Sequence, residues 1–186
     1  MKKIALIIAS ALMALTAGAQ SLGRVNFQEL LYLMPEMDGV REKVDAAQKE
    51  ASETYQSMVD EFQTKYGQYQ QKQSSWTAAI KESKEKELSD IQNRIQEFQQ
   101  TVSQELQEQQ AQLMAPLQEK VQGVIKDIAK AKKLTAVFDN AASYYFDEAT
   151  VLDITPDCRK SLNIPADKTL EALQQELAAK AQAAQQ

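Results

Sequence analysis

The side chains most able to do chemistry are 26 carboxylates and a single thiol, Cys158, and the chain has no histidine. The commonest general acid–base and metal-ligating side chain is therefore missing. A neighbouring pair of carboxylates such as Asp60 and Glu61 is typical of a solvated helix face. The sequence has no phosphate-binding loop, no dinucleotide-binding glycine motif and no cysteine pair. We therefore expect no enzyme activity, no catalytic residues, no cofactor and no metal site.

Two apolar residues could instead form a contact site. Trp76 is the sole tryptophan, and Ile80 follows it by about one helical turn. Both fall at a predicted turn where no core would bury them, so an apolar contact with a binding partner is one interpretation. The other is a local cap in which Trp76 packs over Ile80 and Lys72, and the sequence leaves both open.

The segment from 38 to 132 predicts a long antiparallel helical hairpin. Apolar residues recur every eleven residues in its second half, and this spacing keeps them on one helix face. Pro116 lies inside the return helix, where we expect a bend and not a break. The recurring residues form two series: Ile91, Val102, Leu113 and Val124, and Ile95, Leu106, Leu117 and Ile128.

Matching the apolar positions of the two halves predicts where the chain turns back. Pairing Ala51 with Leu106 and Phe62 with Ile95 centres the turn on Ala78–Ala79. We therefore place the tip near residues 74–83, where serines also favour a turn. The aromatic stripe that runs towards the tip is expected to make the seam looser and more polar than leucine would. It comprises Tyr55, Phe62, Tyr66 and Tyr69.

Residues 1–19 have the pattern of a cleavable signal peptide. Two lysines precede an apolar run, and Ala17-Gly18-Ala19 fits the small-x-small cleavage pattern, so we expect a cut between Ala19 and Gln20. The expected location of the mature chain is a bacterial periplasm. Without the two lysines, 19 basic residues oppose 26 acidic ones. This acidity argues against nucleic acid as a partner and leaves at most transient membrane contact.

Residues 20–37 and 133–164 predict a small β-rich association body, and residues 165–186 a C-terminal helical extension. Thr155 is the expected N-cap of a short helix that begins with Pro156. Cys158 is expected to be a small apolar filler, with an intermolecular disulfide as the alternative. So small a sheet is marginal alone, and we expect an obligate oligomer. The predicted fold class is α+β, mostly α, with a long antiparallel helical hairpin arm projecting from a small β-rich oligomerisation body.

The order of strand, long hairpin and further strands resembles the Skp/OmpH family of periplasmic chaperones. The similarity runs from Arg24-Val25-Asn26 through the hairpin to Leu134–Asp139 and Val151-Leu152-Asp153-Ile154-Thr155. It implies a homotrimer whose arms enclose a cavity. It also implies an ATP-independent holdase that binds unfolded outer-membrane proteins and prevents their aggregation. Trp76 and Ile80 would then be client contacts at the arm tip.

The arms depart from the family pattern in their charge. Residues 38–132 contain 13 basic and 16 acidic residues, whereas the best-known members have basic arms. The family's basic lipopolysaccharide-binding cluster has no counterpart, because Lys81, Lys84 and Lys86 alternate with glutamates. Two other functions remain open. One is a structural coiled-coil spacer or scaffold of the envelope without client binding. The other is an adaptor that docks a membrane complex, which would require flanking lipoyl-like β-domains.

Overall fold

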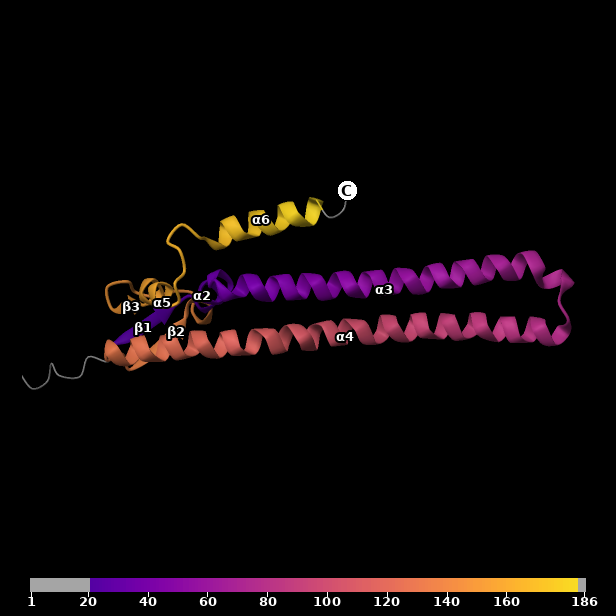
Figure 1. The fold of residues 1–186 in the computed structure, drawn as a ribbon. Helices are drawn as coiled ribbons and strands as arrows, with labels where there is room; N and C mark the ends of the chain where they lie inside the picture. Colours follow the sequence, from indigo (N-terminus) through magenta and orange to yellow (C-terminus); the bar gives the residue numbers. More distant parts are fainter. Residues whose placement is uncertain (1–20, 184–186) are drawn as a thin grey trace, which may run out of the picture. The chain divides into compact units, whose positions relative to one another are not determined.

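The computed structural model describes residues 21–183, so the predicted signal peptide and its cleavage site lie outside the described residues. The described chain is α+β and mostly α, with two long helices and a three-stranded sheet (Figure 1). It divides into two compact units. We call residues 38–116 the hairpin, and residues 21–37 with 117–183 the body.

The hairpin is built from α3 (Glu36–Lys72) and α4 (Ala78–Ala131), whose ends extend into the body. Within the hairpin the two helices run antiparallel, and the 3-10 turn η2 (Gln73–Ser75) lies between them (Figure 1). α4 continues through Pro116, as expected, and the border between the two units falls at this proline. The predicted helical hairpin is therefore confirmed.

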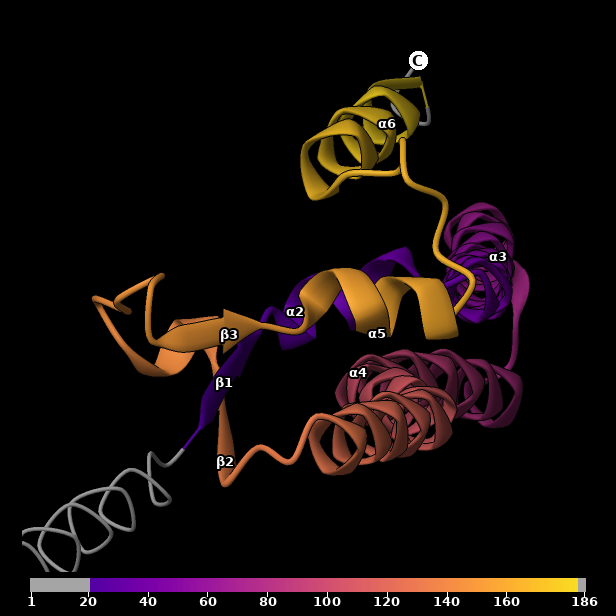
Figure 2. The same cartoon turned by 90° about the vertical axis from the view of Figure 1, so that its left-hand side faces the viewer.

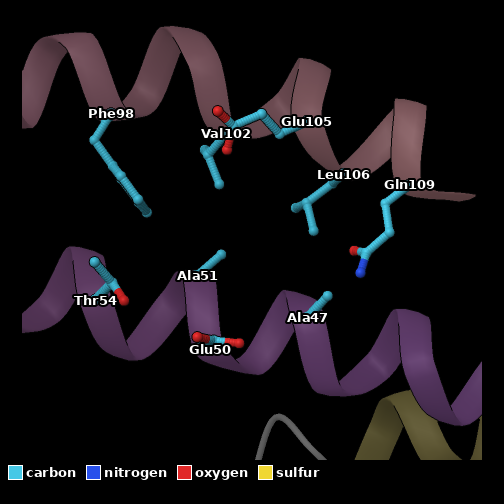
Figure 3. A pocket seen from close by; sticks show the side chains of 9 residues that line it. All are labelled: Ala47, Glu50, Ala51, Thr54, Phe98, Val102, Glu105, Leu106 and Gln109. Carbon is cyan, nitrogen blue, oxygen red and sulfur yellow. The ribbon is translucent and has the colours of Figure 1, made fainter.

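The calculated centre of the turn is wrong by about one helical turn. Ala78 and Ala79 form the start of α4, and Thr77 Oγ1 accepts a hydrogen bond from the Ile80 backbone N–H at 3.4 Å. The register shifts with the turn, and Ala51 lies opposite Val102 instead of Leu106 (Figure 3). Apolar residues recur every three or four positions, so registers one turn apart match the stripes about equally well. The residues of the turn determine which of these registers forms.

The seam between the two helices is shallow. Among the hairpin's hydrophobic residues, only Val40 and Ile91 are buried. Tyr66, predicted as a seam residue, is 45% exposed and stacks on Phe62 of the same helix, with ring centroids 5.8 Å apart. The seam thus leaves most of its apolar residues partly exposed, and its aromatic stripe lies partly on the surface.

The body contains a parallel sheet in the order β2 (Ala136–Asp139), β1 (Leu22–Val25), β3 (Val151–Asp153) (Figure 2). The strand from the start of the described chain therefore lies between two strands that follow the hairpin. Gly23 allows a close approach, because a Cβ there would lie 2.7 Å from Cδ1 of Leu134. The sheet joins both ends of the described chain, as predicted.

The helices α2 (Phe27–Leu33), α5 (Thr155–Ser161) and α6 (Leu170–Ala183) supply much of the body's core. Asn26 caps α2, because its Oδ1 accepts a hydrogen bond from the Glu29 N–H at 3.0 Å. α6 adds one buried residue, Leu173. The fully buried residues of the body are Leu30, Leu33, Met34, Val121, Ile154, Cys158 and Leu162.

Thr155 does not cap α5, which corrects the sequence prediction. Ile154 occupies the N-cap position without a side-chain hydrogen bond. The Thr155 hydroxyl instead accepts a hydrogen bond from the backbone N–H of Asn26 at 2.9 Å. Thr155 is buried, and leaving the Asn26 N–H without an acceptor there would cost free energy. The Thr155 hydroxyl therefore accepts this hydrogen bond and does not cap α5.

Candidate functional site

The hairpin has two neighbouring hollows about midway along its seam. The first has a volume of about 360 Å³, and we call it the seam hollow (Figure 3). Its lining consists of Ala47, Glu50, Ala51, Thr54, Phe98, Val102, Glu105, Leu106 and Gln109. The second, of about 380 Å³, is lined by Ala51, Ser52, Tyr55, Phe98, Gln99, Val102 and Leu106. Four residues belong to both linings, so both hollows open from the same stretch of seam.

Two alanines account for the seam hollow. Ala47 and Ala51 are four residues apart and share one face of α3, where they lie opposite Leu106 and Val102 (Figure 3). Their methyl groups are too short to fill the space between the helices. Phe98 closes one end of the wall and is itself only half-buried. Apolar surface therefore remains accessible from solvent at this point.

The rim of the seam hollow is acidic. Glu50 comes from α3 and Glu105 from α4, and both side chains are exposed. Within residues 21–183, neither carboxylate has an ion pair or a side-chain hydrogen bond, and no lysine or arginine lines the hollow. An apolar wall thus meets two uncompensated negative charges.

At the hairpin tip, Trp76 is half-buried and packs edge-to-face against Tyr69, with ring centroids 5.9 Å apart. Both line a further hollow of about 220 Å³ together with Lys72. Ile80 does not line it and is 44% exposed. Trp76 therefore packs against Tyr69, a residue of α3 that the predicted cap over Ile80 and Lys72 did not include. A contact with another protein at Trp76 or Ile80 stays a prediction.

Charged side chains cross between the helices near the tip. Glu87 accepts hydrogen bonds from Lys65, on the opposite helix, and from Lys84 at 2.8 Å. These two bonds, with that from Lys65 the stronger, lower the pKa of Glu87 to about 2. Arg94 reaches Glu61 across the seam at 3.1 Å. Glu61 and Glu87 are thus compensated by cations, in contrast to the two carboxylates of the seam hollow.

Tyr69 adds a neutral link to the same region. Its hydroxyl donates to the carboxylate of Glu85 on the opposite helix, and this hydrogen bond raises the pKa of Tyr69. Tyr69 thereby contacts Trp76 through its ring and Glu85 through its hydroxyl. The tip is a small organised cluster and not a loose loop.

The body exposes apolar side chains on its sheet and on the segment that joins β2 to β3. Phe138 on β2 is 44% exposed and Leu152 on β3 is 45% exposed. Tyr144 and Tyr145, between the strands, are more exposed still. β2 and β3 are both edge strands, with hydrogen-bonding groups free on one side. Exposed apolar groups beside open edges mark a surface suited to association.

Sequence reasoning missed Phe98, which belongs to neither eleven-residue series. The available signal was the pair Ala47 and Ala51, two small residues four positions apart within a stripe of larger ones. Over the described range, no three carboxylates or thiols come together in a way that could hold a metal ion. None of the helices in that range is long and apolar enough to cross a membrane.

Comparisons with known proteins identify the family of this chain and a crystal structure with the same fold. The sequence profile of the family described as "Outer membrane protein (OmpH-like)" matches residues 21–162. A crystal structure of a candidate outer membrane chaperone (OmpH-like) from Caulobacter crescentus CB15 has the same fold. Its TM-score is 0.69 at 12% identity, over 78% of this chain and 85% of that one. A search of curated proteins found no match. The chain belongs to the OmpH-like outer membrane protein family.

Proposed function

We propose that the mature chain is an ATP-independent holdase chaperone of the periplasm. It binds unfolded outer-membrane proteins and keeps them from aggregating. The family match carries this proposal, because residues 21–162 include the whole hairpin and both outer strands of the sheet. The chaperone description of the Caulobacter protein with the same fold supports a chaperone role in general.

The shallow seam gives the proposal a physical basis. A holdase needs many weak, exchangeable contacts and no fitted pocket, because its clients differ in sequence and have no fixed shape. Half-buried apolar residues along the hairpin can each cover part of a client without unfolding the helices. Trp76 and Ile80 would add contacts at the tip. Neither ATP nor a cofactor is required for binding of this kind.

We further propose that the chain assembles as a homotrimer through the body. A three-stranded sheet with two open edges is marginal alone, and association would cover Phe138, Leu152 and the exposed tyrosines. Three hairpins would then surround a common cavity that holds one client apart from others. Cleavage between Ala19 and Gln20 after export would deliver the subunits to the periplasm.

Aggregation suppression tests the proposal. An unfolded outer-membrane barrel protein is diluted from denaturant with and without the mature chain, and the chain's mass in solution is measured alongside. The expected result is a trimeric mass and clear suppression near one trimer per client. Unchanged aggregation with several clients would refute the holdase and favour a structural envelope spacer. A monomeric mass would refute the proposed assembly.

A further inference from the structure

We propose that the seam hollow binds client segments in which a large apolar side chain adjoins a lysine or arginine. This inference rests on the proposed function and names the client chemistry that the hairpin prefers. It follows from the size of the hollow, the composition of its wall and the charge of its rim.

The size of the seam hollow suits one large side chain of an extended segment. Its volume of about 360 Å³ exceeds the ~150 Å³ of a cavity that accepts benzene. Phe98, Val102 and Leu106 form an apolar wall. The small side chain of Ala51 leaves the space in front of this wall empty (Figure 3). A client side chain placed there would complete packing that the two helices leave unfinished.

The rim of the seam hollow selects the neighbouring residue of the client. Glu50 and Glu105 line the hollow from α3 and α4, and within the described chain neither has a cationic partner. A lysine or arginine next to the inserted side chain would supply that partner, whereas a client carboxylate would be repelled. At the tip, by contrast, Glu87 is already compensated by Lys65 and Lys84. Charge complementarity therefore favours basic-apolar segments at the seam hollow and not at the tip.

The binding test uses the full mature chain and short fluorescein-labelled peptides built on glycine and serine. One peptide carries phenylalanines flanked by lysines, the second phenylalanines flanked by glutamates, and the third serines in place of the phenylalanines. Fluorescence anisotropy should show the lysine–phenylalanine peptide binding about fivefold tighter than the glutamate–phenylalanine peptide, since exposed charge pairs are individually weak. Raised salt should reduce the difference, and the serine peptide should bind weakest.

Two kinds of variant locate the binding. Ala51→Leu fills both hollows with another good helix former and should weaken binding of the lysine–phenylalanine peptide about fivefold. The double variant Glu50→Gln/Glu105→Gln should bring the two phenylalanine peptides to within about twofold of each other. Its matched control is Glu42→Gln/Glu97→Gln, which makes the same charge change at exposed positions that line neither hollow. The control should keep the preference.

The outcomes separate the inference from the proposed function. Equal binding of the lysine and glutamate peptides by the unaltered chain overturns the inference. So does a control variant that loses the preference for the lysine peptide as completely as Glu50→Gln/Glu105→Gln does. Aggregation suppression is measured on the same samples. Suppression without a peptide preference refutes the inference and leaves the holdase standing, whereas absence of both refutes the holdase as well. The glutamine variants change only exposed side chains, so they decide the question even if Ala51→Leu disturbs folding.

Discussion

The body and the hairpin are stabilised in different ways. Twelve of the fourteen buried hydrophobic residues of the described chain belong to the body, and only Val40 and Ile91 belong to the hairpin. The body builds a core from short elements that are distant in sequence. The hairpin relies on long helices, ion pairs between them and a seam that stays half-exposed.

This difference assigns separate tasks to the two units. A region with few buried apolar contacts opens locally at low free-energy cost, and a well-packed region does not. The hairpin can therefore rearrange locally while the body keeps its structure, which is what the proposed holdase function requires. The predictions that follow test this contrast.

The largest expected effect is on the free energy of unfolding. Leu33→Ala empties a fully buried site in the body and should cost about 3 kcal/mol. Leu106→Ala makes the same change at a half-buried seam position and should cost about 1 kcal/mol. Denaturant unfolding at one fixed protein concentration measures both. Equal costs would show that the seam is as well packed as the core.

Thiol reactivity should differ almost as much between the two units. Burial is the main cause that raises the pKa of Cys158 to about 11, so its thiol is neutral and inaccessible near neutral pH. A cysteine introduced by Ala51→Cys in a Cys158→Ala background lies in the open seam. Ellman's reagent should modify it at least about 100-fold faster than Cys158. Comparable rates would mean that the body opens as readily as the hairpin.

Arg159→Ala should have an intermediate effect, confined to the body. The Arg159 guanidinium donates to the Glu29 carboxylate and to the carbonyl oxygens of Pro165 and Lys168, at 2.6 and 2.8 Å. Losing this cluster should cost about 2 kcal/mol and raise hydrogen exchange in residues 163–173. Arg159→Lys keeps the charge but loses the planar fork, and it should recover only part of the protection. Unchanged exchange there would show that α6 is held by other contacts.

The smallest expected effect is a pH dependence of the tip. The pKa of Glu87 lies at about 2, below its ordinary 4.5. Its contribution to stability is therefore complete above pH 4.5 and is lost as the pH falls towards 2. Trp76 is the sole tryptophan, and its fluorescence reports thermal unfolding at the tip. The midpoint temperature of unfolding should decrease as the pH is lowered through this range, and Glu87→Gln should make the decrease smaller. An identical pH profile in the variant would exclude Glu87 as the cause.

Periodicity was enough to predict the hairpin and the strands drawn from both ends of the chain. It could not determine the register, because apolar stripes fit at several registers one turn apart. It also missed the burial of Val121, which lies outside both eleven-residue series but is fully buried in the body. The role of Thr155 was hidden for a related reason, because its partner, Asn26, is 129 residues away.

The candidate site was predictable only in part. A sole tryptophan between two helical stripes marked the tip, but its contact with Tyr69 depends on the local backbone geometry of η2, which the stripes do not specify. The seam hollow depends on which residues lie opposite Ala47 and Ala51, and that follows from the register. Composition did indicate the charge of the hairpin. It could not show which carboxylates are compensated by neighbouring lysines.

The most direct test of the central claim is hydrogen exchange of the mature chain with and without an unfolded outer-membrane barrel protein. Without client, hairpin amides in 44–58 and 95–109 should exchange faster than those of α2 and α5. Addition of client should slow exchange in these hairpin segments and leave the body's core unchanged. Slowing confined to the body, or no slowing at all under conditions that suppress aggregation, would contradict the account.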